Sequence, residues 1–72
     1  MIEIGQVEQL LAVSKYGTLS KAAEALHISQ PALSRAMQKL EEELQVPIFD
    51  REKNRITLNA TGKVAVDYAQ KV

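Results

Sequence analysis

The sequence predicts a mainly α-helical fold, with three helices followed by a two-stranded β-hairpin and the start of a fourth helix. Three observations predict it. Apolar residues recur at helical spacing in separate segments that are bounded by cap residues, glycine or proline. A short stretch of alternating apolar and polar residues follows them. The chain has 72 residues, of which 46% are hydrophobic and 25% charged, as expected for one small folded domain.

The first helix is expected to run from Ile4 to Tyr16. Gly17 follows directly, and glycine is a favoured residue after a helix because it enters the left-handed backbone region at little cost. The apolar residues at helical spacing are Ile4, Val7, Leu10, Leu11 and Val13.

A short second helix is expected to end at Leu26, with Ser20 as its N-cap. Three alanines within residues 22–25 favour helix formation, and their small size lets a neighbouring helix cross closely. We interpret His27 as a turn residue that tolerates unusual backbone angles. It is the only histidine, and without other ligands it is weak evidence for a metal site or for catalysis.

The third helix is expected to run from Gln30 to about Leu44, with Ser29 as its N-cap and Pro31 in its first turn. The sequence Val46-Pro47 ends it, because a residue that precedes proline avoids helical angles. One stripe of this helix should face the core, and its members are Leu33, Ala36, Met37, Leu40 and Leu44.

Residues 48–58 have the alternation of a hairpin, which would have to pack on the helices because a lone hairpin is marginal in water. Asn59 can cap a final helix that starts at Ala60. Gly62 in its first turn is unfavourable for a helix, so we expect a close packing contact there. An apolar stripe continues along this helix through Val64, Ala65, Tyr68, Ala69 and Val72.

Two helices joined by a short turn form a helix-turn-helix, and a hairpin behind it forms a wing. In such a winged helix-turn-helix, the first turns of the third helix would enter the major groove of DNA. Arginine pairs there with guanine, glutamine with adenine, and serine with base or phosphate. The candidate DNA-binding residues are Ser20, Lys21, Ser29, Gln30, Pro31, Ser34, Arg35 and Gln38, with Arg51, Lys53 and Arg55 of the wing as phosphate contacts.

The charge balance leaves an alternative open. Nine basic and nine acidic residues give a formal net charge of zero, whereas nonspecific nucleic-acid binders are usually strongly basic. The acidic run Glu41–Glu43 lies in the third helix itself. Since Glu42 follows Arg35 by about 10 Å at 1.5 Å per residue, the acids can stay outside the groove. A winged helix that binds a protein partner and no DNA remains the alternative.

Other classes of function find little support. There is no cysteine, no glycine-rich phosphate loop and no evident catalytic carboxylate pair, so we expect neither an enzyme nor a metal or cofactor site. The N-terminus has no basic region followed by an apolar run, and no apolar stretch approaches the length that spans a membrane. We therefore expect a cytoplasmic protein that does not bind membranes.

Residues 20–35 (SKAAEALHISQPALSR), 40–44 (LEEEL) and 46–51 (VPIFDR) together resemble the N-terminal DNA-binding domain of LysR-type bacterial transcriptional regulators. The resemblance implies a winged helix-turn-helix domain over residues 1–58 that binds double-stranded DNA at an inverted-repeat operator. Residues 59–72 would then be the N-terminal part of a linker helix through which a homodimer forms. The effector domain of that family would be absent, and with it any small-molecule ligand.

The chain departs from the family pattern at three places. Gln45 stands where the family usually has glycine, so the turn after the third helix can differ. Asn59 stands where threonine is common, although both residues can cap a helix. The wing sequence at residues 52–55 lacks the usual glycine.

Overall fold

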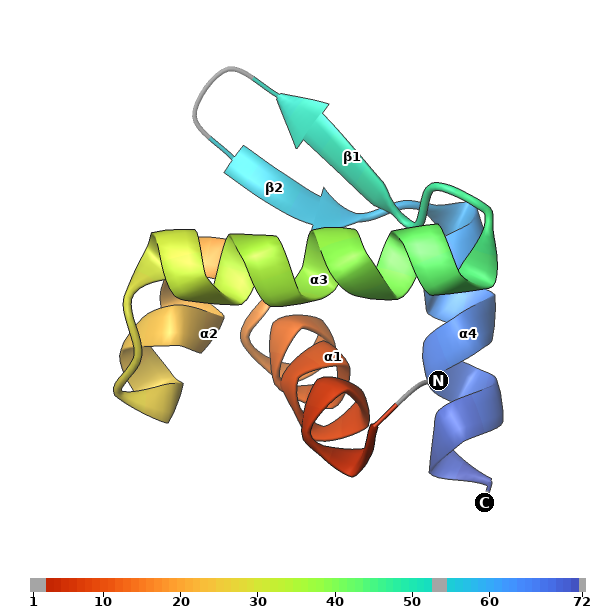
Figure 1. The fold of residues 1–72 in the computed structure, drawn as a ribbon, viewed down its shortest axis with the longest axis horizontal. Helices are drawn as coiled ribbons and strands as arrows, with labels where there is room; N and C mark the ends of the chain where they lie inside the picture. The colour runs from red at the N-terminus through yellow and green to blue at the C-terminus, as the bar shows by residue number, and fades with distance from the viewer. Residues whose placement is uncertain (1–2, 53–54, 72) are drawn as a thin grey trace.

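The structure, a computed structural model, describes residues 3–52 and 55–71. Its elements are α1 (Ile4–Tyr16), α2 (Leu19–Leu26), α3 (Gln30–Leu44), β1 (Phe49–Glu52), β2 (Arg55–Leu58) and α4 (Ala60–Gln70). Helix α3 crosses the molecule, with α1 and α2 below it and the hairpin above it, and α4 descends beside the C-terminal end of α3 (Figure 1). The predicted mainly α-helical fold with a two-stranded antiparallel wing is confirmed.

Cap residues place both ends of α3 where the sequence predicts them. The Oγ atom of Ser29 accepts a hydrogen bond from the N–H of Ala32 at 3.2 Å, and Pro31 occupies the first turn. At the other end, Gln45 has the left-handed backbone angle φ 61°, and its N–H donates to the carbonyl oxygen of Glu41 at 2.8 Å. This helix thus ends with a left-handed residue that is not glycine.

The start of α2 differs from the prediction. Thr18, and not Ser20, is the N-cap, and its Oγ1 atom accepts a hydrogen bond from the N–H of Lys21 at 3.1 Å. Starting the helix at Leu19 places that side chain in the core, where it is 1% exposed. Burial of Leu19 therefore decides between two residues that can both cap. His27 ends the helix at φ 59°, which confirms its interpretation as a turn residue.

The core lies between α3 and the other helices. Leu33, Met37 and Leu40 are buried in the middle of it, and Ala36 and Leu44 pack against them half-buried, as the predicted stripe requires. The remaining buried apolar residues are Leu10, Val13, Leu19, Ala22, Ala23, Ile48, Phe49 and Val66.

The wing is anchored at its base. Phe49 pairs with Leu58 and Arg51 with Ile56, so these four side chains share the face of the hairpin that Phe49 turns toward the core. Strand β2 packs against α1, α2 and α4. This packing supplies the support that an isolated hairpin lacks.

Asn59 joins the base of the wing to α4. Its N–H donates to the carbonyl oxygen of Ile48 at 3.0 Å, and its Nδ2 atom donates to the carbonyl oxygen of Pro47 at 3.1 Å. Its Oδ1 atom accepts a hydrogen bond from the N–H of Gly62 at 2.7 Å and so caps α4. One residue therefore holds the segment before β1 and the first turn of α4 together.

Gly62 makes the close packing contact that its position predicts. It is buried, and a Cβ atom built on it would collide with the carbonyl oxygen of Ile48 and lie 2.7 Å from Cδ2 of Leu58. The helix crosses the base of the wing so closely that no side chain fits between them.

Replacing Gln45 with glycine should stabilise the fold. The left-handed region costs a residue with a Cβ atom about 1–2 kcal/mol, and glycine avoids this cost. Part of the stabilisation is offset because glycine gives the unfolded chain more conformational entropy. We expect Gln45→Gly to raise the free energy of unfolding by about 0.5–1 kcal/mol, measured by urea denaturation. Gln45→Val is the control and should lower it, since a β-branched residue fits this region worst. A destabilised glycine variant would contradict the left-handed conformation.

Candidate nucleic-acid interface

The outer face of α3 carries a stripe of polar residues. Pro31, Arg35 and Gln38 are exposed, and they lie four and three residues apart, so they align along one side of the helix. Gln30 and Ser34 are half-buried beside this stripe. The arrangement follows from the opposite face, because the burial of the core stripe leaves only this side of α3 for contact with another molecule.

The beginnings of two helices add hydrogen-bond donors. Ser20 and Lys21 are exposed in the first turn of α2, and Ser29 is exposed at the start of α3. The first N–H groups of a helix lack partners within it and carry a partial positive charge. This is the chemistry that phosphate groups bind to.

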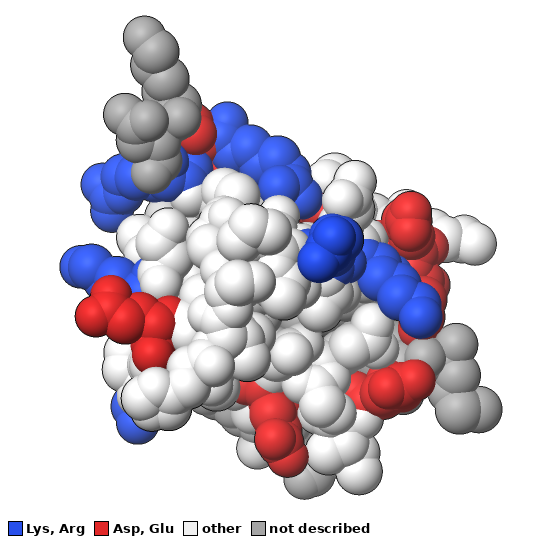
Figure 2. All heavy atoms as spheres, turned by 60° about the vertical axis from the view of Figure 1, so that its left-hand side comes forward, with Lys and Arg blue, Asp and Glu red and all other residues white. Residues whose placement is uncertain are grey.

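The wing contributes basic residues with different surroundings. Arg55 is exposed at the start of β2, and the side chain of Arg51 is 46% exposed but forms an ion pair. Lys53 lies outside the described residues. Figure 2 shows Lys and Arg side chains in separate groups at the upper left, at the left edge and right of centre, around a largely uncharged middle, with Asp and Glu side chains beside several of them and along the lower part of the face. A chain without net charge therefore still presents local groups of basic side chains.

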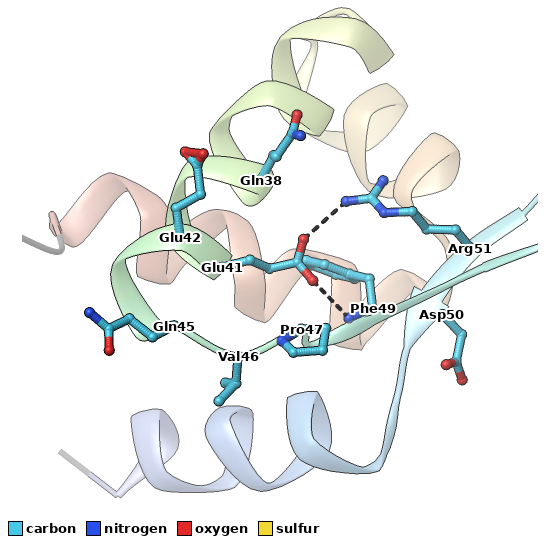
Figure 3. A pocket seen from close by; sticks show the side chains of 9 residues that line it. All are labelled: Gln38, Glu41, Glu42, Gln45, Val46, Pro47, Phe49, Asp50 and Arg51. Atoms are coloured by element: carbon cyan, nitrogen blue, oxygen red, sulfur yellow. Dashed lines mark hydrogen bonds and ion pairs between the residues drawn. The ribbon is translucent and has the colours of Figure 1, made fainter.

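Glu41 connects α3 with β1. Its Oε2 atom accepts hydrogen bonds from the N–H groups of Ile48 at 2.8 Å and Phe49 at 3.3 Å. Its Oε1 atom accepts one from Nη2 of Arg51 at 3.0 Å, and the Glu41 side chain is only 14% exposed (Figure 3). The three acids 41–43 are alike in the sequence, but the structure gives Glu41 a role in joining the wing to α3.

Glu41 and Arg51 also line a groove of about 630 Å³ between the C-terminal half of α3 and β1 (Figure 3). Gln38 and Arg51, both predicted to contact DNA, lie on its wall together with Glu41. The other lining residues are Glu42, Gln45, Val46, Pro47, Phe49 and Asp50.

None of the four described members of the predicted α4 stripe is buried in the core. Val64 and Tyr68 are 65% and 74% exposed, and Ala65 and Ala69 are half-buried. Val66 was not among the predicted residues, but it is 5% exposed and packs into the core one turn after Gly62. Its spacing of four from the closely packed glycine was the available signal. The fifth predicted member of the stripe, Val72, lies outside the described residues.

A second, smaller groove of about 180 Å³ runs along this side of α4. It is lined by Val7, Leu10, Leu40, Leu44, Ala65, Tyr68 and Ala69, all of them apolar or aromatic. Together with the exposed Val64, it gives α4 an apolar surface that its own domain leaves uncovered.

Known proteins share both sequence and fold with this chain. A probable RuBisCO transcriptional regulator of Emiliania huxleyi is 39% identical over 69 residues, which cover 96% of this chain and 22% of that protein. An SDS degradation transcriptional activation protein of a Pseudomonas species is 35% identical over 72 residues, which cover 100% of this chain and 24% of that protein. The chain thus spans about a fifth to a quarter of the length of these relatives.

Solved structures with the same fold include complexes with DNA. The CbnR_DBD–DNA complex superposes with a TM-score of 0.88 at 36% identity, over 97% of this chain and 80% of that one. The BenM_DBD/catB site 1 DNA complex superposes with a TM-score of 0.86 at 34% identity, over 97% and 75%. The family model of the bacterial regulatory helix-turn-helix proteins of the lysR family matches residues 4–63. This chain therefore belongs to the lysR family of bacterial regulatory helix-turn-helix proteins.

Proposed function

We propose that this chain binds double-stranded DNA sequence-specifically, as the DNA-binding part of a bacterial transcriptional regulator. The observation that carries the proposal is the exposed stripe of Pro31, Arg35 and Gln38 on a helix that is capped at its start. Two proteins with the same fold, CbnR and BenM, have been solved in complex with DNA. These complexes favour DNA binding over a winged helix that serves only as a protein-interaction module.

In the proposed complex, the N-terminal turns of α3 enter the major groove. Arg35 pairs with a guanine, Gln38 and Gln30 reach adenines or phosphates, and Pro31 and Ser34 contact base edges or the sugar–phosphate chain. The helix starts supply further contacts to phosphate through Ser20, Lys21 and Ser29. Arg55 of the wing lies on the backbone or in the minor groove, and the same role is proposed for Lys53.

We also propose a homodimer that forms through α4. Val64 and Tyr68 are exposed apolar and aromatic side chains next to the apolar groove at Ala65 and Ala69, and burying them against a second copy removes apolar surface from water. We place Val72 in the same contact. A two-fold dimer reads an inverted repeat, with half-sites separated by about 34–36 Å or by a multiple of this distance.

The relatives are named as transcriptional regulators, and we infer a regulatory and non-enzymatic role for this chain as well. Regulation of bacterial genes places the proposed activity in the cytoplasm. Among the helices in residues 3–52 and 55–71, none combines the length and the apolar character needed to cross a membrane.

Binding to DNA should depend steeply on salt. Each phosphate contact releases a counterion, so the logarithm of the affinity should fall linearly with the logarithm of the salt concentration, by about 0.9 per contact. With several contacts from the helix starts and the wing, we expect a slope of magnitude about 4 or more. Fluorescence anisotropy with a labelled random-sequence duplex, titrated at several salt concentrations, measures it. Absence of binding at low salt would refute the proposal.

A further inference from the structure

We propose that Glu41 is a positioning residue for DNA binding, which fixes the orientation of the wing relative to α3 through Arg51 and the start of β1. The inference rests on the proposed DNA-binding function. It assigns a role in binding to an acidic residue that does not itself touch DNA.

The carboxylate of Glu41 connects α3 to the start of the wing. Both of its oxygens are used, since Oε2 accepts from the N–H groups of Ile48 and Phe49 and Oε1 accepts from Nη2 of Arg51 (Figure 3). The three donors belong to the first strand of the wing and to the residue before it. A single side chain of α3 therefore holds the wing strand at two places, its backbone and its arginine.

The two strands of the hairpin are held to the helices in different ways. Its second strand, β2, packs against α1, α2 and α4. The side of the hairpin formed by β1 faces the open groove along α3, and Glu41 reaches across this groove to it. Without this link, the angle between β1 and α3 would depend on that side on the burial of Phe49 and of Ile48 before it.

A fixed angle between the wing and α3 should strengthen DNA binding. The proposed DNA contacts include Arg35 on α3 and Arg55 on β2. When two binding elements are held rigidly in their bound arrangement, less conformational freedom is lost on binding, and the second contact forms as an intramolecular event. A wing that moves relative to α3 would bind more weakly even if all of its basic residues were retained.

Because Glu41 is negatively charged, its positioning role and its repulsion of phosphate predict opposite changes in DNA affinity when it is replaced. Removing an acidic group near bound DNA should by itself leave affinity unchanged or raise it, because it removes repulsion from phosphate. Positioning predicts the opposite. Glu42 is the matched control, since it is exposed, lies next to Glu41 on the same helix and carries the same charge.

The experiment compares Glu41→Gln and Glu42→Gln in the full chain, each with and without Arg55→Gln, by anisotropy on a random-sequence duplex over a range of salt. We expect Glu41→Gln to lower the affinity about threefold to tenfold and to reduce the magnitude of the salt slope by about one. In the Arg55→Gln background, Glu41→Gln should cause a smaller loss, because one of the wing contacts that it positions is gone. Glu42→Gln should bind as tightly as the wild type or more tightly.

Two results would overturn the proposal. One is a Glu41→Gln variant that binds as well as Glu42→Gln. The other is an equal loss with and without Arg55, which would mean that Glu41 does not act through the wing. If the wild type fails to bind DNA even at low salt, the proposed function itself fails, and the inference with it.

Thermal unfolding checks that the variants are folded. If Glu41→Gln is unfolded, Arg51→Gln takes its place, because it leaves intact the two hydrogen bonds that Glu41 accepts from the N–H groups of Ile48 and Phe49. A loss of affinity that is smaller in the Arg55→Gln background supports the positioning role. If Arg51→Gln lowers the affinity by the same factor with and without Arg55→Gln, Arg51 is an independent phosphate contact. That result would overturn the positioning role assigned to Glu41 and Arg51.

Discussion

Gly62→Ala should destabilise the domain by about 3 kcal/mol or more. The added methyl group would collide with the carbonyl oxygen of Ile48, and this oxygen cannot move freely because it accepts the hydrogen bond from the N–H of Asn59. Relief of the collision requires α4 to move away from the base of the wing. Urea denaturation followed by circular dichroism measures the change in the free energy of unfolding.

Gly5 provides the matched control for this substitution. It also lies in the first turn of a helix, but a Cβ atom built on it meets nothing within 4 Å. Gly5→Ala should therefore stabilise the domain by up to about 1 kcal/mol, as expected for replacing glycine with alanine in a helix. Equal effects of the two substitutions would contradict the close crossing of α4 over the wing.

Arg35→Ala should weaken binding to the preferred DNA sequence by about 1–3 kcal/mol, which corresponds to roughly a fivefold to 150-fold loss of affinity. The expected reason is loss of a bidentate pair with guanine, so the preference at one base pair should relax as well. The measurement requires an operator selected from a random DNA library with the wild-type chain. Anisotropy with that operator and with variants at single base pairs then gives the affinity and the preference.

Lys39→Ala is the control, because Lys39 is exposed one turn further along the same helix. It should change the affinity much less and leave the base preference as it is. If Arg35→Ala instead lowered affinity equally for all DNA sequences, Arg35 would be a phosphate contact, and the reading of guanine would have to be assigned elsewhere.

The elements of this fold were largely predictable because their ends carry local signals. Ser29 with Pro31 marks the start of α3, and Gly17 marks the end of α1. The start of α2 was predicted at the wrong residue because Thr18 and Ser20 can both cap, and only the tertiary burial of Leu19 decides between them. Local chemistry thus predicts that a helix begins, whereas the core determines at which residue.

The candidate site was predictable only in part. The outer residues of α3 follow from helical periodicity, and Arg35 is exposed as predicted. The connection of Glu41 to Arg51 spans ten residues and depends on how the hairpin folds back on the helix. One signal was present, since Arg51 shares a strand face with the apolar Phe49 and so should turn toward the helices. The partner could not be chosen among the three adjacent glutamates.

The hydrogen bonds of Asn59 have a mechanical consequence. They join the first turn of α4 to Pro47 and Ile48, the two residues that precede the wing. The close approach at Gly62 leaves no space in which α4 could shift relative to these residues. Helix α4 and the base of the wing should therefore move as one rigid unit about Ile48. A torque applied to the far end of α4 would be transmitted to the wing without passing through α3.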